Sequence, residues 1–281
     1  MMSPARPNYK KMNEIIEILK DAGIEKYIFE ARIIEEHAKK NNLDAFALAS
    51  RRIMREPLQY ILGEWEFYGD IYKLNKDCLI PRPETEFLTE YVINNAEKGA
   101  LILDLCSGSG CVSISALKRR EDLRAILIDI SAGAVNISRE NAEINEVSDR
   151  INFYCLDIIK DAGEIMRLCN PDLIVSNPPY LSLREVNRLK AENAELSHEP
   201  ESAFFGGIDG LDFYKFIINN YKNICREIVF ECGINQYKKI IELFELHDFK
   251  CEIIRDYNKI ERIIIGINSR GEQRSPENQR K

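Results

Sequence analysis

The sequence predicts an α/β protein in which a Rossmann-like sheet is preceded by a small helical domain. Three observations lead to this fold class. From residue 100 onward, short apolar runs typical of buried strands alternate with stretches typical of helices. A glycine-rich turn, Cys106-Ser-Gly-Ser-Gly110, stands between the first such run and a helical stretch. The N-terminal part shows helical periodicity instead. At 281 residues and 45% hydrophobic, the chain can bury the cores of two domains.

Residues 1–63 are predicted to form the helical domain. Apolar residues at helical spacing mark helices near 15–22, 27–41 and 45–53. The chain up to Lys73 contains 12 basic and 12 acidic residues, so the net charge of −7 belongs wholly to the remainder. A neutral helical bundle without a catalytic-looking cluster fits a substrate-docking module, or simple structural packing.

Residues 64–76 are predicted to form a β-hairpin that links this bundle to the larger domain, residues 77–267. The residues that indicate a hairpin are Trp65, Phe67, Ile71 and Tyr72, which alternate around Gly69-Asp70. The larger domain begins with a loop at 79–86 that leads into a helix. Residues 268–281 form a polar tail without apolar spacing, which we expect to be disordered.

The larger domain is predicted to alternate strands and helices. Strands are expected at 100–105, 125–130, 151–155, 173–175, 227–233, 251–254 and 262–266, and helices at 112–118, 212–223 and 236–246. Ligands of open α/β sheets bind outside the carboxyl ends of the strands. Side chains that directly follow these strands are therefore candidates for a binding site.

Acidic residues stand at the ends of three successive predicted strands: Asp104, Asp129 and Asp157. Asp129 lies about 20 residues beyond the glycine-rich turn, a spacing typical of an acid that holds ribose hydroxyls. Asp157 could reach an adenine amino group. Each acid alone is more simply a strand-end or helix-cap residue. The three together favour a nucleotide-like ligand.

The stretch 172–180 joins a short buried strand to the turn Asn177-Pro-Pro-Tyr180. Prolines have a fixed φ and no N–H, and Pro178 favours an extended conformation at Asn177. The side-chain oxygen of Asn177 and the carbonyl of Pro178 can then accept both hydrogens of a planar –NH2 group, with the Tyr180 ring beside them. The turn is therefore predicted to grip an amine. The alternative is a Pro-Pro turn that merely ends a strand.

Other classes of site find less support. The eight cysteines are scattered without a C-x-x-C pair and the three histidines are isolated, so neither a metal site nor a hydrolase triad is predicted. No apolar run reaches membrane-spanning length and the N-terminus lacks a signal-peptide pattern, so a cytoplasmic location is expected. The net charge of −7 is unfavourable for gripping phosphate backbones, so direct nucleic-acid binding is not expected.

Four motifs together resemble those of the HemK/PrmC protein-(glutamine-N5) methyltransferases. They are Asn177-Pro-Pro-Tyr180, Leu79-Ile-Pro-Arg-Pro-Glu-Thr-Glu86, the loop from Asp104 to Gly110, and Gly206-Gly-Ile-Asp-Gly-Leu211, within a match from about Pro57 to Arg262. The resemblance implies a class I S-adenosylmethionine-dependent methyltransferase fold. It also implies methylation of the glutamine in the Gly-Gly-Gln motif of peptide chain release factors.

The resemblance also implies roles for individual residues. The cofactor S-adenosyl-L-methionine would be bound by Cys106, Ser107, Gly108, Ser109, Gly110, Asp129, Asp157, Ile158 and Asn177. The catalytic residues would be Asn177, Pro178 and Tyr180, and the glutamine would be held by Asn177, Pro178, Pro179 and Tyr180. Positioning is expected to dominate, because no histidine or lysine is obviously placed to deprotonate the amide.

Two departures from the family pattern stand out. Cys106 occupies a position where the family usually has glycine, and the stretch from Asp256 to Arg262 keeps the acid and the arginine of a family pattern without its glycine. Three alternatives stay open. The substrate could be a ribosomal-protein glutamine or the N6 atom of adenine in nucleic acid, or the chain could be a non-catalytic cofactor-binding partner protein.

Overall fold

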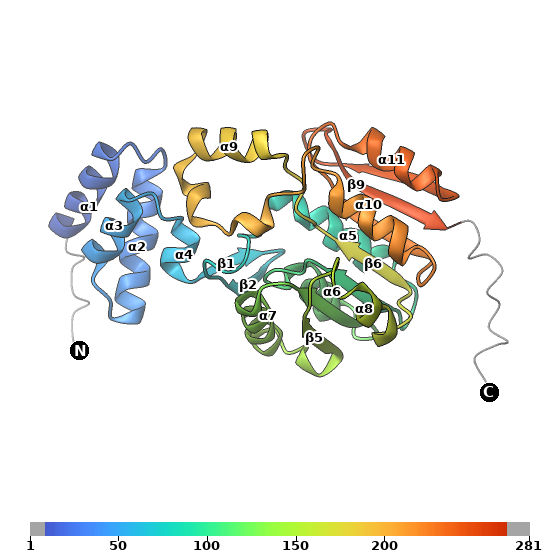
Figure 1. Cartoon of the computed structure of the whole chain (residues 1–281). Coiled ribbons are helices and arrows are strands. Elements are labelled where there is room, and N and C mark those ends of the chain that lie inside the picture. The colour runs from blue at the N-terminus through green and yellow to red at the C-terminus, as the bar shows by residue number, and fades with distance from the viewer. Residues whose placement is uncertain (1–8, 269–281) are drawn as a thin grey trace.

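The computed structural model describes residues 9–268, and its N-terminal part is a helical bundle (Figure 1). The bundle contains α1 (Tyr9–Asp21), α2 (Tyr27–Asn41), α3 (Ala45–Ile53) and α4 (Leu58–Leu62). Its own apolar core includes the fully buried side chains of Ile15, Leu19 and Ile34. The three predicted helices are confirmed. The five-residue helix α4 is additional, since so short a segment shows no periodicity.

The predicted hairpin is confirmed, with its turn shifted by one residue. Strands β1 (Glu64–Phe67) and β2 (Asp70–Lys73) pair antiparallel, and Phe67 lies opposite Asp70. The turn is therefore Tyr68-Gly69, and both residues have positive φ, 51° and 78°, as a type I′ turn requires. The hairpin is anchored on both sides: Trp65 packs against the bundle core, and the Tyr72 hydroxyl shares a 2.5 Å hydrogen bond with Ser115 Oγ.

All seven predicted strands join one sheet in the order β5-β4-β3-β6-β7-β9-β8. They are β3 (Leu101–Leu105), β4 (Arg124–Asp129), β5 (Ile151–Cys155), β6 (Leu173–Ser176), β7 (Glu227–Glu231), β8 (Phe249–Arg255) and β9 (Glu261–Asn268). The first five run parallel, whereas β9 pairs antiparallel with both β7 and β8. Asn268 belongs to β9, not to the predicted tail. Residues 269–281, the rest of that prediction, lie outside the described residues.

Helices cover both faces of this sheet, and each face has its own apolar core. One face carries α5 (Glu86–Asn95), α6 (Cys111–Arg119) and α7 (Ala132–Ile144); the other carries α8 (Ala162–Leu168), α10 (Asp212–Tyr221) and α11 (Tyr237–Glu245). The predicted helices are present, with ends that differ by one or two residues. Within residues 9–268, no helix is long and apolar enough to cross a membrane.

A segment after β6 leaves the sheet, approaches the bundle and returns. It contains α9 (Leu183–Glu192) and two short 3₁₀ turns, η3 (Ala194–His198) and η4 (Glu201–Ala203), and is closed by a bridge between Leu181 and Phe205. Figure 1 shows α9 between the bundle and the C-terminal helices. The sequence analysis predicted no element in this segment, where α9 is mostly polar and buries only Val186.

Candidate active site

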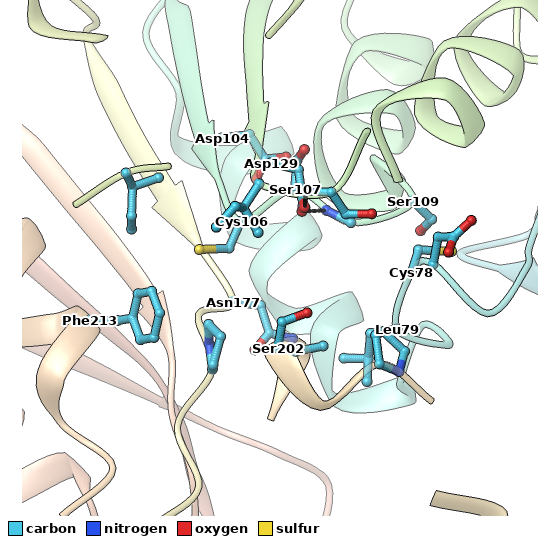
Figure 2. A pocket seen from close by; sticks show the side chains of 18 of the residues that line it. Cys78, Leu79, Asp104, Cys106, Ser107, Ser109, Asp129, Asn177, Ser202 and Phe213 are labelled. Atoms are coloured by element: carbon cyan, nitrogen blue, oxygen red, sulfur yellow. Dashed lines mark hydrogen bonds between the residues drawn. The ribbon is translucent and has the colours of Figure 1, made fainter. Parts of the chain in front are cut away.

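A cavity of about 340 Å³ lies at the carboxyl ends of β3, β4 and β6, where the strand order reverses. Most of the predicted site residues line it: Cys106, Ser107, Gly108, Ser109, Asp129, Asp157, Ile158, Asn177 and Pro179. Figure 2 shows Asp104, Cys106 and Asp129 gathered on one side and Asn177 with Ser202 on the other. Gly110, Pro178 and Tyr180 do not line this cavity.

The glycine-rich turn lies between β3 and α6 and is held by backbone hydrogen bonds to β4 and within the turn itself. Ser107 N–H donates to the Ile128 carbonyl (3.0 Å) and Gly110 N–H donates to the Ser107 carbonyl (2.8 Å). Gly108 has φ +55°, and a Cβ there would meet no atom within 4 Å. Its backbone therefore presents an open surface that a ligand can approach closely. Gly110 instead serves packing, because a Cβ there would lie 2.8 Å from Ile114 Cδ1.

Cys106 has a left-handed backbone conformation, φ +61°, which glycine adopts more readily than any other residue. A non-glycine residue pays about 1 kcal/mol for that conformation. The side chain packs against the core on the α10 face while lining the cavity. Burial raises the pKa of its thiol far above the ordinary value. Cys106 is thus a neutral, apolar part of the cavity wall rather than a reactive thiol.

Asp129 closes the glycine-rich turn and faces the cavity. Its Oδ2 accepts from Gly108 N–H (2.8 Å) and its Oδ1 from Ser131 N–H (2.9 Å). Burial raises the pKa of the carboxyl, and the backbone hydrogen bonds act in the opposite direction. Each carboxylate oxygen has a second lone pair, so Asp129 can still accept from ribose hydroxyls.

The other two acids differ from Asp129 and from each other. Asp157 Oδ1 accepts from the backbone N–H groups of Ile159 (2.9 Å) and Lys160 (3.3 Å). Burial acts to raise the pKa of the Asp157 carboxyl, but these hydrogen bonds outweigh burial, so the pKa is lower than its ordinary value. Asp104 is buried and accepts from Ser113 Oγ (2.6 Å). Burial raises the pKa of Asp104 to about 7. Both acids line the cavity. The contact between Asp157 and an adenine amino group stays a prediction.

Asn177 is held at the end of β6 by a chain of polar contacts that the sequence did not reveal. Its Nδ2 donates to Thr85 Oγ1 (3.2 Å), and Thr85 Oγ1 donates to Glu231 Oε2 (2.6 Å). Thr85 lies within the motif at 79–86, and Glu231 lies within a predicted strand, but neither position carries a local sign of this contact. Within the described part of the chain, no group donates to Asn177 Oδ1.

The rest of the Asn-Pro-Pro-Tyr turn packs against the glycine-dense loop that follows η4. A Cβ on Gly206 would overlap the Pro179 carbonyl, and a Cβ on Gly210 would overlap the Tyr180 carbonyl. The Tyr180 carbonyl also accepts from Gln236 Nε2 (2.7 Å). The two motifs therefore support each other through direct backbone contact. Tyr180 packs against the core on the α10 face, and its role as a stacking surface for substrate stays a prediction.

Arg82 and Glu84 of the 79–86 loop are partly exposed, and each has an oppositely charged partner. Arg82 Nη2 donates to Glu199 Oε1 (2.6 Å), and Glu199 Oε2 accepts from Ile80 N–H (3.1 Å). Glu84 lies 3.9 Å from Arg262, which also pairs with Asp256 (3.0 Å). The C-terminal motif thus keeps its acid–arginine pair without the family's glycine. Glu199 joins the 79–86 loop to the segment 181–205, and both line the cavity.

The lining has the groups that S-adenosyl-L-methionine needs. Asp129 offers acceptors for ribose hydroxyls, and Leu156, Ile158 and Phe213 offer apolar surface for a base. Ser107 Oγ is buried and, among the described residues, has no hydrogen-bond partner. Buried polar atoms are normally satisfied, so this hydroxyl fits a site completed by a ligand.

The fold and this site define the class: a class I, S-adenosyl-L-methionine-dependent methyltransferase. In agreement, the family model "Methyltransferase small domain" matches residues 83–194. The chain belongs more narrowly to the release factor glutamine methyltransferase family. It is 34% identical to the release factor glutamine methyltransferase of Thermodesulfovibrio yellowstonii, over 92% of each chain. It is 32% identical to that of Staphylococcus aureus, over 92% of this chain and 98% of the relative.

Solved structures share the fold at low sequence identity. The hMettl16 catalytic domain in complex with a MAT2A 3'UTR hairpin is 15% identical with a TM-score of 0.55, and the match covers 78% of this chain and 81% of that one. The structure of SMU.776 complexed with SAH is 16% identical with a TM-score of 0.50, covering 73% of this chain and 56% of that one. These likenesses show the fold alone.

Proposed function

We propose that this chain transfers the methyl group of S-adenosyl-L-methionine to the side-chain amide nitrogen of the glutamine in the Gly-Gly-Gln motif of peptide chain release factors. Asn177 carries the proposal. It lines the cavity while its amide nitrogen donates to Thr85, which leaves its oxygen to accept from a substrate amide. The relatives named release factor glutamine methyltransferases support the identity of the substrate.

In this proposal the protein acts mainly by aiming the nitrogen. An amide nitrogen is a weak nucleophile, because its lone pair is delocalised into the carbonyl. When bound, S-adenosyl-L-methionine supplies an electrophilic methyl group on sulfonium. Asn177 Oδ1 and the Pro178 carbonyl each accept one hydrogen of the glutamine amide, and such orientation is worth roughly 7–11 kcal/mol of the barrier. The same acceptors stabilise the positive charge that develops on nitrogen.

The rest of the cavity is assigned to the cofactor. Asp129 binds the ribose hydroxyls, and the turn 106–110 with Asp157 and Ile158 surrounds the remaining parts. The open backbone at Gly108 and the unpaired hydroxyl of Ser107 support this assignment.

The bundle, residues 1–63, is proposed to dock the release factor, with 64–76 as its linker and 77–267 as the catalytic domain. Glutamine is a common side chain, so the Asn177 turn alone cannot select one glutamine in one protein. Specific protein interfaces bury roughly 800 Å² per partner, more than a crevice at the strand ends supplies. The bundle offers further surface. Since release factors act with ribosomes, the proposal implies a cytoplasmic location.

Two rival substrates would use similar chemistry. A glutamine of a ribosomal protein differs only in what surrounds it. Adenine N6 in nucleic acid is less favoured as a substrate, because a protein with a net charge of −7 repels phosphate groups. Arg82 lines the cavity but is already paired with Glu199.

The test is methyl transfer from labelled S-adenosyl-L-methionine by the full chain to purified release factor, ribosomal proteins and DNA. Label should reach the release factor, and peptide mass spectrometry should find it on the Gly-Gly-Gln glutamine. A release factor whose motif is changed to Gly-Gly-Asn is the matched control and should stay unlabelled. Equal labelling of that control, or label on ribosomal protein or DNA alone, would refute the proposed substrate.

A further inference from the structure

We propose that Thr85 and Glu231 are positioning residues that hold the Asn177 amide with its oxygen, rather than its nitrogen, turned toward the substrate amide. The proposal rests on the methyl transfer proposed above, in which Asn177 Oδ1 accepts from the reacting group. The two residues are 146 positions apart in the chain. Thr85 ends η1 (Pro83–Thr85), Glu231 ends β7 and Asn177 follows β6, so the fold alone brings them together.

The direction of the hydrogen-bond chain fixes the orientation of the amide. An ionised carboxylate can only accept, so Glu231 takes the single hydrogen of the Thr85 hydroxyl. Thr85 Oγ1 is then left as an acceptor, and Asn177 meets it with its Nδ2 hydrogen. If the amide turned over, two acceptor oxygens would face each other without a hydrogen between them. Leaving such buried groups unpaired is unfavourable, because they lose their hydrogen bonds to water without gaining others.

The surroundings make this contact effective. Thr85 is 3% exposed and Glu231 is 1% exposed, so water does not compete for either group. The titratable and charged groups that face Glu231 are Arg262, Arg82, Glu84, Tyr180, Tyr214, Cys111 and Cys232. Burial raises the pKa of Glu231 to about 7, opposed by the hydrogen bond from Thr85 and by the charge of Arg262.

A pKa in this range makes the orientation depend on pH. Protonated Glu231 can donate to Thr85, whose own hydrogen is then free to bond to Asn177 Oδ1. With these hydrogen bonds reversed, the –NH2 group of Asn177 would face the –NH2 group of the substrate. Both groups are hydrogen-bond donors, so no hydrogen bond could form between them. We therefore expect the acceptor that aims the nitrogen to become less available as Glu231 takes up a proton.

The kinetic test compares variants at Thr85 with one at Glu231, using wild-type enzyme and release factor. Thr85→Val keeps the shape of the side chain without the hydroxyl, and kcat should fall about 10- to 100-fold while the Kd for S-adenosyl-L-methionine stays within about twofold. Thr85→Ser should restore most of kcat. In Glu231→Gln, whose amide can donate or accept, kcat should fall and its dependence on pH near 7 should weaken.

A second readout does not need turnover. The side-chain ¹⁵N–¹H signals of Asn177, identified by their absence in Asn177→Ala, should shift with a midpoint near pH 7 in the wild type and remain still in Glu231→Gln. Static signals in the wild type, or wild-type kcat in Thr85→Val, would overturn the positioning role. Signals that follow Glu231 in an enzyme that does not methylate release factor would support the positioning contact and overturn the proposed substrate.

Discussion

Arg52 of the helical bundle donates to Glu195 of the segment after β6, with 2.6 Å between Nη2 and Oε1. On its other side, the same guanidinium donates from Nε to Glu30 Oε2 (2.5 Å), and Arg52 itself is 4% exposed. The segment that contains Glu195 also contributes Ser202 and Phe205 to the cavity. One buried arginine therefore links the proposed docking domain to the wall of the active site.

The first prediction separates the two partners of Arg52. Glu30→Gln removes the more buried carboxylate and should lower the free energy of unfolding of the bundle by about 2–3 kcal/mol, because part of a buried positive charge is left uncompensated. Glu195→Gln should cost less than about 1 kcal/mol, since the Glu195 side chain is 32% exposed. Trp65, the only tryptophan, packs against the bundle core and reports its unfolding in urea. Equal losses in the two variants would contradict this ranking.

The second prediction concerns the proposed aiming acceptor. Asn177→Ala should leave S-adenosyl-L-methionine binding nearly unchanged and lower kcat by at least about 100-fold, because one of two acceptors for the substrate amide is gone. Calorimetry gives the Kd and a methyl-transfer assay gives kcat. Asn220→Ala is the matched control: Asn220 is exposed on α10 and donates only to the Phe216 carbonyl, so both quantities should stay at wild-type values. Wild-type kcat in Asn177→Ala would remove Asn177 from the reaction.

The third prediction is that Asp129→Asn is no milder than Asp129→Ala. Both carboxylate oxygens of Asp129 accept from backbone N–H groups, one from Gly108 and one from Ser131. An asparagine must turn its –NH2 group toward one of these donors, so it loses either the contact with the glycine-rich turn or the contact with Ser131. We expect either variant to weaken S-adenosyl-L-methionine binding by about 1–3 kcal/mol in calorimetry. Asp149→Asn, on the exposed turn η2 (Ser148–Arg150), is the control. Unchanged affinity in Asp129→Asn would disprove the assignment to the cofactor.

These predictions depend on contacts that a sequence shows to different degrees. The strands and Asn177 could be predicted, because apolar runs and a Pro-Pro turn act on the local backbone. Asp104 and Asp129 could be placed near each other, because parallel strands end at one edge of a sheet. The antiparallel insertion of β9 between β7 and β8 could not, since the order of strands depends on long-range packing.

The residues around Asn177 could not be predicted for the same reason, because their contacts depend on long-range packing. Thr85 resembles any other polar residue of a loop, and Glu231 resembles any strand-end acid; only the pairing of β6 with β7 and the docking of η1 bring them to Asn177. Arg82 and Glu199 are likewise 117 positions apart. A sequence shows which residues are charged, but only the fold shows which of them are buried. Buried charges need partners, so these pairs could not be predicted from the sequence.

The fourth prediction concerns stability and pH. Buried Asp104 keeps its proton up to about pH 7 in the native state, against an ordinary pKa of 3.8 in an unfolded chain. Between these values the native state binds more protons, so the free energy of unfolding should fall as pH rises from about 4 to 7, by roughly 4 kcal/mol at most. Glu231 adds an effect of the same sign. Asp104→Asn should remove its share of the slope in urea unfolding at several pH values. An unchanged slope would show that Asp104 is ionised in the native state.

The last prediction tests the contact between the glycine-dense loop and the Asn-Pro-Pro-Tyr turn. Gly206 cannot move away from that turn: its N–H donates to the Leu181 carbonyl (2.9 Å), and its carbonyl accepts from Asp212 N–H (3.0 Å). A Cβ added by Gly206→Ala would lie 2.9 Å from Tyr180 Cα and overlap the Pro179 carbonyl. The turn that follows Asn177 must therefore shift.

We expect Gly206→Ala to lower the free energy of unfolding by about 1–3 kcal/mol and kcat by about 10- to 100-fold, since a displacement of about 1 Å can misaim the reacting amide. The affinity for S-adenosyl-L-methionine should change less, because Asp129 lies across the cavity from Asn177 (Figure 2). Gly163→Ala is the matched control. Gly163 lies in α8, where a Cβ has no neighbour closer than 3.9 Å, and alanine should leave stability unchanged or raise it by up to about 1 kcal/mol. If Gly206→Ala behaves like this control, the loop does not support the turn, and its contact with the turn is not needed to position Asn177.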